Sequence, residues 1–151
     1  MTATILALDA SSTAIGWIVL DGGAVRDHGT AILSGADIND RCRQAHAYVG
    51  SLLRCYPDLD CVAIESPVGR FIKAVIPQAL VSGAIRTAVR LVELHVIDVS
   101  PTEAKRALSG SGAASKTLMQ AVASQYGVTG EHAADAVGVA LAAAAKVRVT
   151  T

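Results

Sequence analysis

The chain has 151 residues, a length typical of one folded domain that buries its core without disulfides or a structural metal. Hydrophobic residues make up 52% of it and no charge-dense or Pro/Ser-rich tract interrupts them, so we expect no disordered region. Charged residues or His interrupt every apolar run before it reaches the length of a membrane span, and no secretory signal is evident at the N-terminus. We therefore expect a cytoplasmic protein with no membrane partner.

The three cysteines, Cys42, Cys55 and Cys61, are an odd number and form no CxxC pair. This spacing favours buried or free thiols over a zinc site or a disulfide framework.

The formal net charge is zero, which by itself argues weakly against a nucleic-acid-binding protein. The charge is unevenly distributed, however, because residues 66–116 carry seven Lys or Arg residues against three acids, a net charge of +4. That half of the chain could present a basic face, or its charges could be scattered over the surface. Composition leaves both interpretations open.

The first third of the chain predicts three antiparallel strands followed by a helix. The strand segments are residues 4–9 (TILALD), 15–20 (IGWIVL) and 24–33. Asp21-Gly22-Gly23, between the second and the third, is a hairpin sequence because glycine adopts positive φ at little cost. From residue 37 to about 54 apolar residues recur at helical spacing, and Tyr56-Pro57 ends that helix.

The rest of the chain alternates strands and helices. Residues 61–65 (CVAIE) are apolar until a terminal acid, as in a strand buried on both faces. A helix is expected from near Pro77 to about Glu93, followed by a strand at 95–99 (HVIDV). Ser100, Pro101 and Glu103 form a capping-box start for the next helix, which should stop at the glycines of residues 109–112. Two further helices are expected at 115–126 and 131–146, the last largely buried.

This order, β-β-β-α-β-α-β-α-α-α, predicts an α/β fold in which a mixed five-stranded sheet carries helices on both faces. It is the order of the ribonuclease H-like fold. We see no repeat and no second domain, so residues 1–151 are expected to form a single domain.

Two acids stand at the ends of predicted buried strands. Asp9 ends the first strand and Glu65 ends the fourth, each after an apolar run. A carboxylate at the mouth of a buried strand costs desolvation energy unless a cation or hydrogen bonds compensate it. Either acid taken alone is better explained as a solvated strand end.

A third acidic element opens the last predicted helix. His132 and Asp135 are three residues apart, ~60° around the helix and ~4.5 Å along it, and so lie on one face. Taken alone, Asp135 is better explained by the preference of acids for the first helical turn. Together, Asp9, Glu65, His132 and Asp135 can supply three carboxylates and an imidazole to one place. Such ligands suit two Mg²⁺ or Mn²⁺ ions, one activating a water and one stabilising a leaving 3′-oxygen in phosphodiester cleavage.

Four motifs in order resemble those of the RuvC-type Holliday-junction resolvases, and the similarity runs from about Thr4 to Ala145. The motifs are residues 9–17 (DASSTAIGW), 61–65 (CVAIE), 104–116 (AKRALSGSGAASK) and 132–136 (HAADA). Each is weakly specific by itself, whereas four in the same order are strongly specific.

This resemblance implies a homodimeric endonuclease that binds four-way DNA junctions and nicks two strands of like polarity symmetrically. It implies that Asp9, Glu65 and Asp135 bind metal, and that Lys105 and Lys116 contact the DNA backbone without reading sequence. Lys116 also opens a helix after a glycine-containing turn, where backbone N–H groups favour phosphate, although an ordinary solvated lysine is the alternative. We add three basic residues as candidate DNA contacts: Arg70, Lys73 and Arg106.

The chain departs from the family pattern in three places. His132 stands where many members have an acid, which tilts the site towards softer ions such as Mn²⁺. Asp9 is followed by Ala-Ser where Pro-Gly is common, which should leave the acid in place. Val68 replaces an aromatic residue, and Phe71 is then a candidate base-stacking wedge, with core packing as the alternative.

Three other functions fit parts of this pattern. Actin-like and sugar-kinase ATPases share this topology but enclose a nucleotide between two such domains, so we expect no nucleotide cofactor here. A catalytically silent junction-binding protein would lack one of the acids. A related nuclease acting on flaps or other branches would keep the same site, because substrate shape is not read by the metal ligands. Heavy use of Ala hints at a GC-rich bacterial or viral genome.

Overall fold

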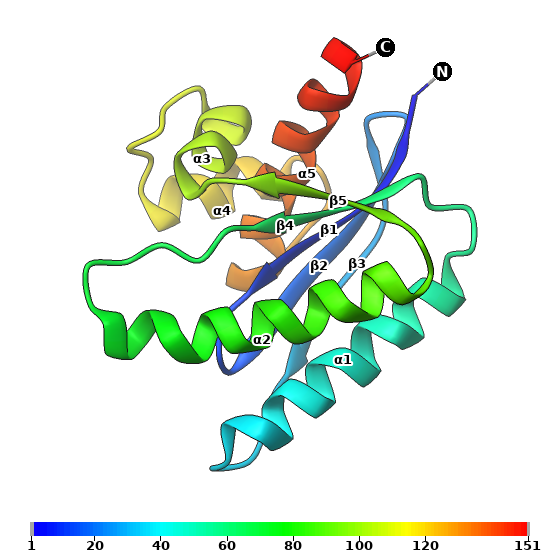
Figure 1. Ribbon diagram of the computed structural model, residues 1–151. Helices are drawn as coiled ribbons and strands as arrows, with labels where there is room; N and C mark the ends of the chain where they lie inside the picture. Colours follow the sequence, from blue (N-terminus) through cyan, green and yellow to red (C-terminus); the bar gives the residue numbers. More distant parts are fainter. Residues whose placement is uncertain (1, 151) are drawn as a thin grey trace.

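The computed structural model describes residues 2–150 as one five-stranded sheet flanked by helices (Figure 1). The sheet order is β3-β2-β1-β4-β5. β2 pairs antiparallel with both β1 and β3, whereas β4 is parallel to β1 and β5 is parallel to β4. The strands are β1 Thr4–Ala10, β2 Ala14–Asp21, β3 Ala24–Ile32, β4 Cys61–Glu65 and β5 His95–Val99. The helices are α1 Ile38–Cys55, α2 Ile72–Leu91, α3 Pro101–Ser109, α4 Lys116–Ser124 and α5 Glu131–Thr150. The predicted mixed sheet is confirmed.

The strict alternation of side chains along the strands builds two separate cores. Ile5 and Ala7 of β1 point to the face covered by α3, α4 and α5, and join a core with much of α5. Leu6 and Leu8 point to the other face and pack with residues of α1 and α2. Figure 1 shows α1 and α2 together on one side of the sheet and α5 on the other. Because both faces of β1 and β4 are covered, these strands carry apolar residues on both sides.

Most local signals in the sequence correspond to observed features. Gly22 and Gly23 have positive φ, of 59° and 87°, and close the hairpin between β2 and β3. The Ser100 side chain accepts from the Glu103 N–H while Glu103 reaches back to the Ser100 N–H, so the capping box of α3 is formed. Gly110 ends α3 in the left-handed conformation, with φ 81°. The three cysteines are free thiols, as expected.

The predicted start of α2 near Pro77 is wrong, because the helix begins at Ile72 and Pro77 lies inside it. Proline is common at the first helical position because its missing N–H has no partner there, and that preference suggested the later start. In the structure the helix is already formed before Pro77, since the N–H groups of Ala74 and Val75 both donate to the Phe71 carbonyl. The proline then removes only one further intrahelical hydrogen bond near an exposed helix end.

By length and composition α2 would also be long and apolar enough to cross a membrane, contrary to the expectation from the sequence. The fold gives another reason for its composition. Val81, Ile85 and Val89 are buried in the core on one face of the helix, while Ile72, Ile76 and Leu80 are exposed. Arg86, in the middle of the helix, forms an ion pair with Asp98 of β5. The helix thus carries one apolar face for the core and a second that faces outward.

Candidate metal centre

Strand register brings the first two acids together. In the parallel pair of β1 and β4, Ile5 lies opposite Cys61 and Ala7 opposite Ala63, and all four belong to the core on the α5 side of the sheet. One further step of two residues along each strand places Asp9 and Glu65 on that same face, side by side. Because alternate residues of a strand face the same side, both carboxylates project towards α5 and not towards α1 and α2.

The third acid reaches the same place from α5. Asp9, Glu65 and Asp135 line one cavity of about 190 Å³ between the strand ends and the helices α3, α4 and α5. Lys105 of α3 and Lys116 of α4 line it as well. His132, one turn before Asp135 on α5, is near enough for its charge to act on the carboxyl of Asp9. The structure thus gathers the four predicted metal ligands and both predicted backbone-contacting lysines around one site.

Crowding of the carboxyl groups shows in their pKa values. Burial, followed by the charge of Glu65 and a hydrogen bond with it, raises the pKa of Asp9 to about 8. Burial and the charge of Asp9 raise the pKa of Asp135 to about 6. The pKa of Glu65 is also raised, chiefly by burial, although the charge of Lys105 lowers it. Carboxylates held this close in a partly buried site favour a cation, which would neutralise their mutual repulsion.

The donor set suits a divalent cation, although the side chains are not yet arranged around one. Three carboxylates and an imidazole are ligands that Mg²⁺ or Mn²⁺ accepts. Within residues 2–150, no three His, Cys, Asp or Glu side chains are grouped so as to hold one ion as they stand. Asp9 instead hydrogen-bonds with Glu65 and with Asp135. The three carboxyl groups that line the cavity, with the nearby His132 imidazole, are the side chains that would hold such an ion.

Two glycines allow α5 to pack closely against its neighbours, Gly16 at the contact with β2 and Gly138 at the contact with α3. A Cβ on Gly16 of β2 would lie 2.0 Å from the His132 carbonyl oxygen, so no larger residue fits there without moving the start of α5. A Cβ on Gly138 would lie 2.6 Å from the Ala104 carbonyl oxygen of α3. Gly16 belongs to the first family-like motif, and its role is this close contact between β2 and α5.

Lys116 is held at the mouth of the cavity by an ion pair with Glu131, the residue that opens α5. Its helix is capped by Ser115, whose side chain accepts from the Leu118 N–H. The Lys116 side chain is largely exposed, so a phosphate could replace Glu131 as its partner. Sequence spacing does not indicate that Glu131 pairs with this lysine, because the two are fifteen residues apart.

The other basic candidates lie elsewhere. Arg106 is the neighbour of Lys105 in α3 but lines a different groove, of about 460 Å³, between α3 and the second half of α5. Arg70 and Lys73 are exposed at the start of α2, on either side of Phe71. Phe71 is 77% exposed, so the alternative that it packs in the core is wrong.

Four further residues connect α2 with the strand ends and were not singled out from the sequence. Gln78 of α2 donates a hydrogen bond to the carbonyl of Ala10, the residue that follows Asp9. Arg86 of α2 pairs with Asp98 of β5, which also accepts a hydrogen bond from Ser66, immediately after Glu65. No motif marks these residues, and only their long-range contacts reveal them.

The family assignment rests on a sequence match over nearly the whole chain. The model of the family described as crossover junction endodeoxyribonuclease RuvC matches residues 5–143. The chain belongs to this family. It is accordingly a metal-dependent endodeoxyribonuclease that resolves Holliday junctions, and the sugar-kinase alternative no longer applies.

Solved structures agree on the fold. RuvC of Thermus thermophilus in complex with a Holliday junction substrate superposes with a TM-score of 0.84 at 23% identity, covering 99% of this chain and 97% of that one. A second structure of Thermus thermophilus RuvC gives 0.81 at 23% identity, covering 97% and 96%. The yeast mitochondrial Holliday junction resolvase Ydc2 gives 0.62 at 9% identity, covering 97% and 80%. A search of curated proteins finds no match.

Proposed function

We propose that this resolvase cuts four-way DNA junctions as a homodimer by paired symmetric nicks, with two Mg²⁺ or Mn²⁺ ions at each site. We further propose that Asp9, Glu65, His132 and Asp135 hold these ions. The observation that carries the proposal is the single cavity lined by three carboxylates from β1, β4 and α5 and flanked by two lysines. The ions would supply an activated water and stabilise the leaving 3′-oxygen.

The chain's own residues would prepare this chemistry in three ways. The strand ends fix the separation of Asp9 and Glu65, and the close contact of Gly16 with the His132 backbone fixes the approach of α5. Lys105 and Lys116 face the carboxylates across the cavity and would hold the scissile phosphate there against the repulsion of three negative groups. Phosphate contacts of this kind position DNA without reading its sequence.

The start of α2 supports a role in junction recognition. Phe71 is largely exposed to solvent between two basic residues, Arg70 and Lys73. An exposed aromatic ring can stack on an unpaired base while basic neighbours contact the backbone. We therefore propose that the segment of residues 70–73 inserts at the branch point of the junction. Arg106 would contact DNA only outside the metal cavity, because it lines the separate groove beside α5.

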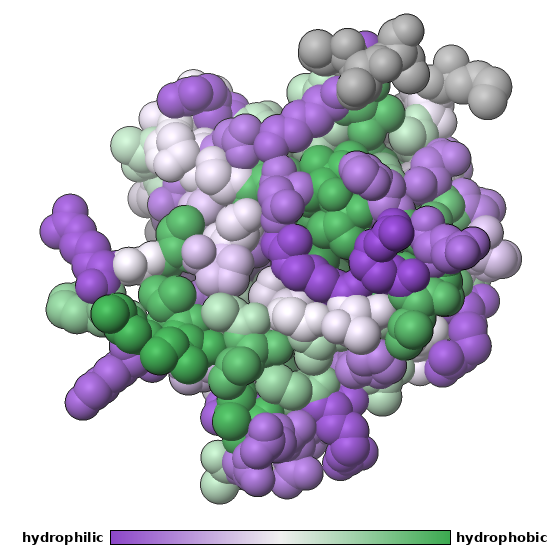
Figure 2. All heavy atoms as spheres, viewed as in Figure 1, coloured by the Kyte–Doolittle hydropathy of each residue, from purple (hydrophilic) through white to green (hydrophobic). Residues whose placement is uncertain are grey.

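Dimerisation is proposed through the outer face of α2. Ile72, Ile76 and Leu80 are exposed and recur one helical turn apart, with Leu91 exposed further along. Figure 2 shows a run of hydrophobic surface at the lower left, over the first half of α2. Further along the same helix Gly83 is exposed, whereas Ala88 is buried in the core. An exposed apolar stripe on a helix is typical of a face that packs on another protein surface.

The deciding experiment compares substrates of different shape. The protein is incubated with a labelled four-way junction, a flap and a linear duplex of the same sequence, with Mg²⁺ or Mn²⁺. We expect paired nicks in two junction strands of like polarity, and none with Glu65→Gln, which should still bind the junction. Preferential cutting of the flap would instead assign the same site to a different branched substrate. Because the substrate is DNA, we propose that the protein acts in the cytoplasm of a bacterial cell, or in the host cell of a virus.

A further inference from the structure

The two strand ends that carry Asp9 and Glu65 are held by α2 from the opposite face of the sheet. At the end of β1, the Gln78 side-chain amide donates a hydrogen bond of 3.1 Å to the Ala10 carbonyl oxygen. Since Ala10 directly follows Asp9, this bond fixes the backbone from which the Asp9 side chain projects. It is the first of two polar links between α2 and the metal centre.

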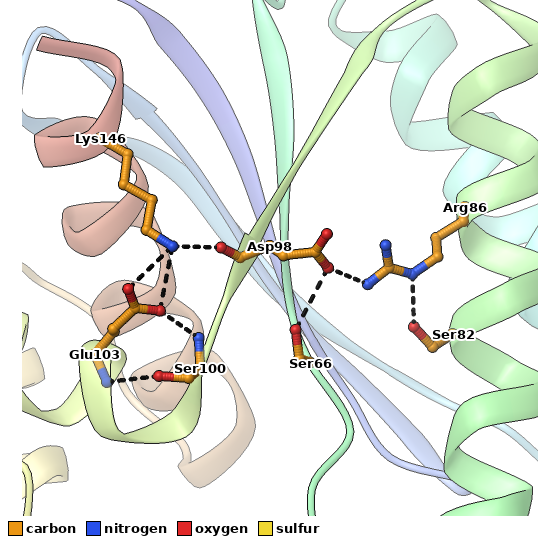
Figure 3. Close-up of polar contacts among 7 residues, drawn as sticks. All are labelled: Ser66, Ser82, Arg86, Asp98, Ser100, Glu103 and Lys146. Atoms are coloured by element: carbon orange, nitrogen blue, oxygen red, sulfur yellow. Dashed lines mark hydrogen bonds and ion pairs between the residues drawn. The ribbon is translucent and has the colours of Figure 1, made fainter. Parts of the chain in front are cut away.

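The second link runs through a chain of side chains to the end of β4 (Figure 3). The Arg86 guanidinium pairs with the Asp98 carboxylate, and Arg86 Nε donates to Ser82 Oγ at 3.2 Å. Ser82 is buried, so the guanidinium is oriented from within the helix packing. Asp98 Oδ1 also accepts from Ser66 Oγ at 3.4 Å.

Ser66 directly follows Glu65, and its N–H donates to the Val99 carbonyl at 2.8 Å, which continues the pairing of β4 with β5. Both contacts of Ser66 therefore lie on β5, one to the Asp98 side chain and one to the Val99 backbone. The Arg86 cation thus reaches the backbone beside Glu65 through only two intervening side chains.

Asp98 is also held from the other face of the sheet. Lys146 Nζ of α5 lies 2.6 Å from the Asp98 carbonyl oxygen and 3.1 Å from Glu103 Oε1. Glu103 in turn completes the capping box of α3, the helix that carries Lys105. Figure 3 shows Asp98 contacted by Arg86 of α2 on one side and by Lys146 of α5 on the other, with Glu103 of α3 joined to Lys146.

We propose that Arg86 is a positioning residue for the metal centre, acting through Asp98 and Ser66 on Glu65, with Gln78 acting in the same way on Asp9. This inference rests on the proposed metal site. A half-exposed ion pair contributes little to stability, whereas residues that orient metal ligands commonly change metal affinity or activity by ~10–100-fold. The same contacts would transmit a displacement of α2, whose outer face is exposed, to both ligand-bearing strands.

The test compares Arg86→Gln with a matched control on the same helix. Arg90 lies one turn further on and donates to the Leu94 carbonyl at 3.0 Å, at the end of the helix away from the metal cavity. Mn²⁺ affinity is measured by calorimetry, and kcat and junction Kd are measured separately. We expect Arg86→Gln to weaken Mn²⁺ binding and lower kcat by roughly ten-fold each, with junction Kd unchanged. Arg90→Gln should match the wild type, and Arg86→Lys should recover most of the loss.

Several results would overturn the proposal. Equal Mn²⁺ affinity in Arg86→Gln and Arg90→Gln would do so, as would a parallel loss of Mn²⁺ affinity, junction affinity and melting temperature, which indicates general unfolding. If Arg86→Gln fails to fold, the Mn²⁺ affinity of Gln78→Met is measured instead, since this variant removes the hydrogen bond to the Ala10 carbonyl. An affinity equal to that of the wild type would reject the proposal that α2 positions the metal ligands. A wild-type protein that cuts no junction would refute the proposed function, while the Mn²⁺ comparison would still test positioning.

Discussion

Replacing Asp9 by Asn should abolish cleavage and at the same time make the metal-free protein more stable. In the fold the pKa of Asp9 is raised to about 8 by burial and by the neighbouring Glu65, whereas in the unfolded chain it ionises near 4. Between these values the unfolded state binds fewer protons than the folded state, so the free energy of unfolding falls as the pH rises from about 4 to about 8. Asparagine carries no charge in either state and does not incur this loss.

The size of the effect follows from the same linkage. A carboxyl group whose pKa rises from about 4 to about 8 loses at most ~5 kcal/mol of stability by pH 8. Water that enters the cavity screens the charge, so we expect ~1–3 kcal/mol to remain. For a chain of 151 residues this corresponds to a melting temperature higher by about 3–10 °C. The advantage of Asp9→Asn should grow from pH 5 to pH 8.

The assay is thermal unfolding of metal-free wild type and Asp9→Asn between about pH 5 and 8.5, a range that spans the raised pKa of Asp9, repeated with saturating Mg²⁺ or Mn²⁺. Asp21→Asn, at the exposed end of β2, is the control and should change little. The metal should stabilise the wild type more than Asp9→Asn and so narrow the difference. If Asp9→Asn melts at or below the wild-type temperature throughout this pH range, the claim that burial and Glu65 destabilise the ionised Asp9 carboxylate is refuted. Full-rate cleavage by Asp9→Asn would refute the assignment of Asp9 to the metal site.

Four further predictions concern the surroundings of the site. Gly16→Ala should cost ~2–4 kcal/mol in urea unfolding and reduce cleavage, because its Cβ would meet the His132 carbonyl. Lys105→Ala or Lys116→Ala should weaken junction binding and lower its salt slope by ~1 for each phosphate that the variant no longer neutralises, and unchanged slopes would remove both lysines from the interface. His132→Asp should keep activity, weaken a preference for Mn²⁺ and extend cleavage to lower pH, since an imidazole must be neutral to bind metal; a dead variant with intact metal binding would identify His132 as a base or phosphate contact instead. Leu80→Glu should shift the mass in light scattering from dimer to monomer at micromolar concentration, and a monomeric wild type would contradict the proposed interface.

Local chemistry made much of this fold predictable. Glycines at the β2–β3 turn, the Ser100–Glu103 capping box and the acids close to the ends of β1 and β4 each act within a few residues, so their consequences can be inferred from order and spacing. The misplaced start of α2 shows the limit of such rules. Proline at the first helical position is a preference and not a requirement, and the apolar residues before Pro77 continue the helix.

Order and spacing along the chain were enough to predict the succession of strands and helices, the acids at the ends of β1 and β4, and the placement of His132 with Asp135 on one turn of α5. The packed structure was needed to show that Lys105 faces the metal cavity while its neighbour Arg106 faces another groove, and that Phe71 is exposed. It was needed equally to show that Arg86 and Gln78 reach the strand ends from the far side of the sheet. Such contacts join residues up to 68 positions apart, and they depend on how the helices are rotated when their apolar faces pack against the sheet, which no spacing within the chain encodes.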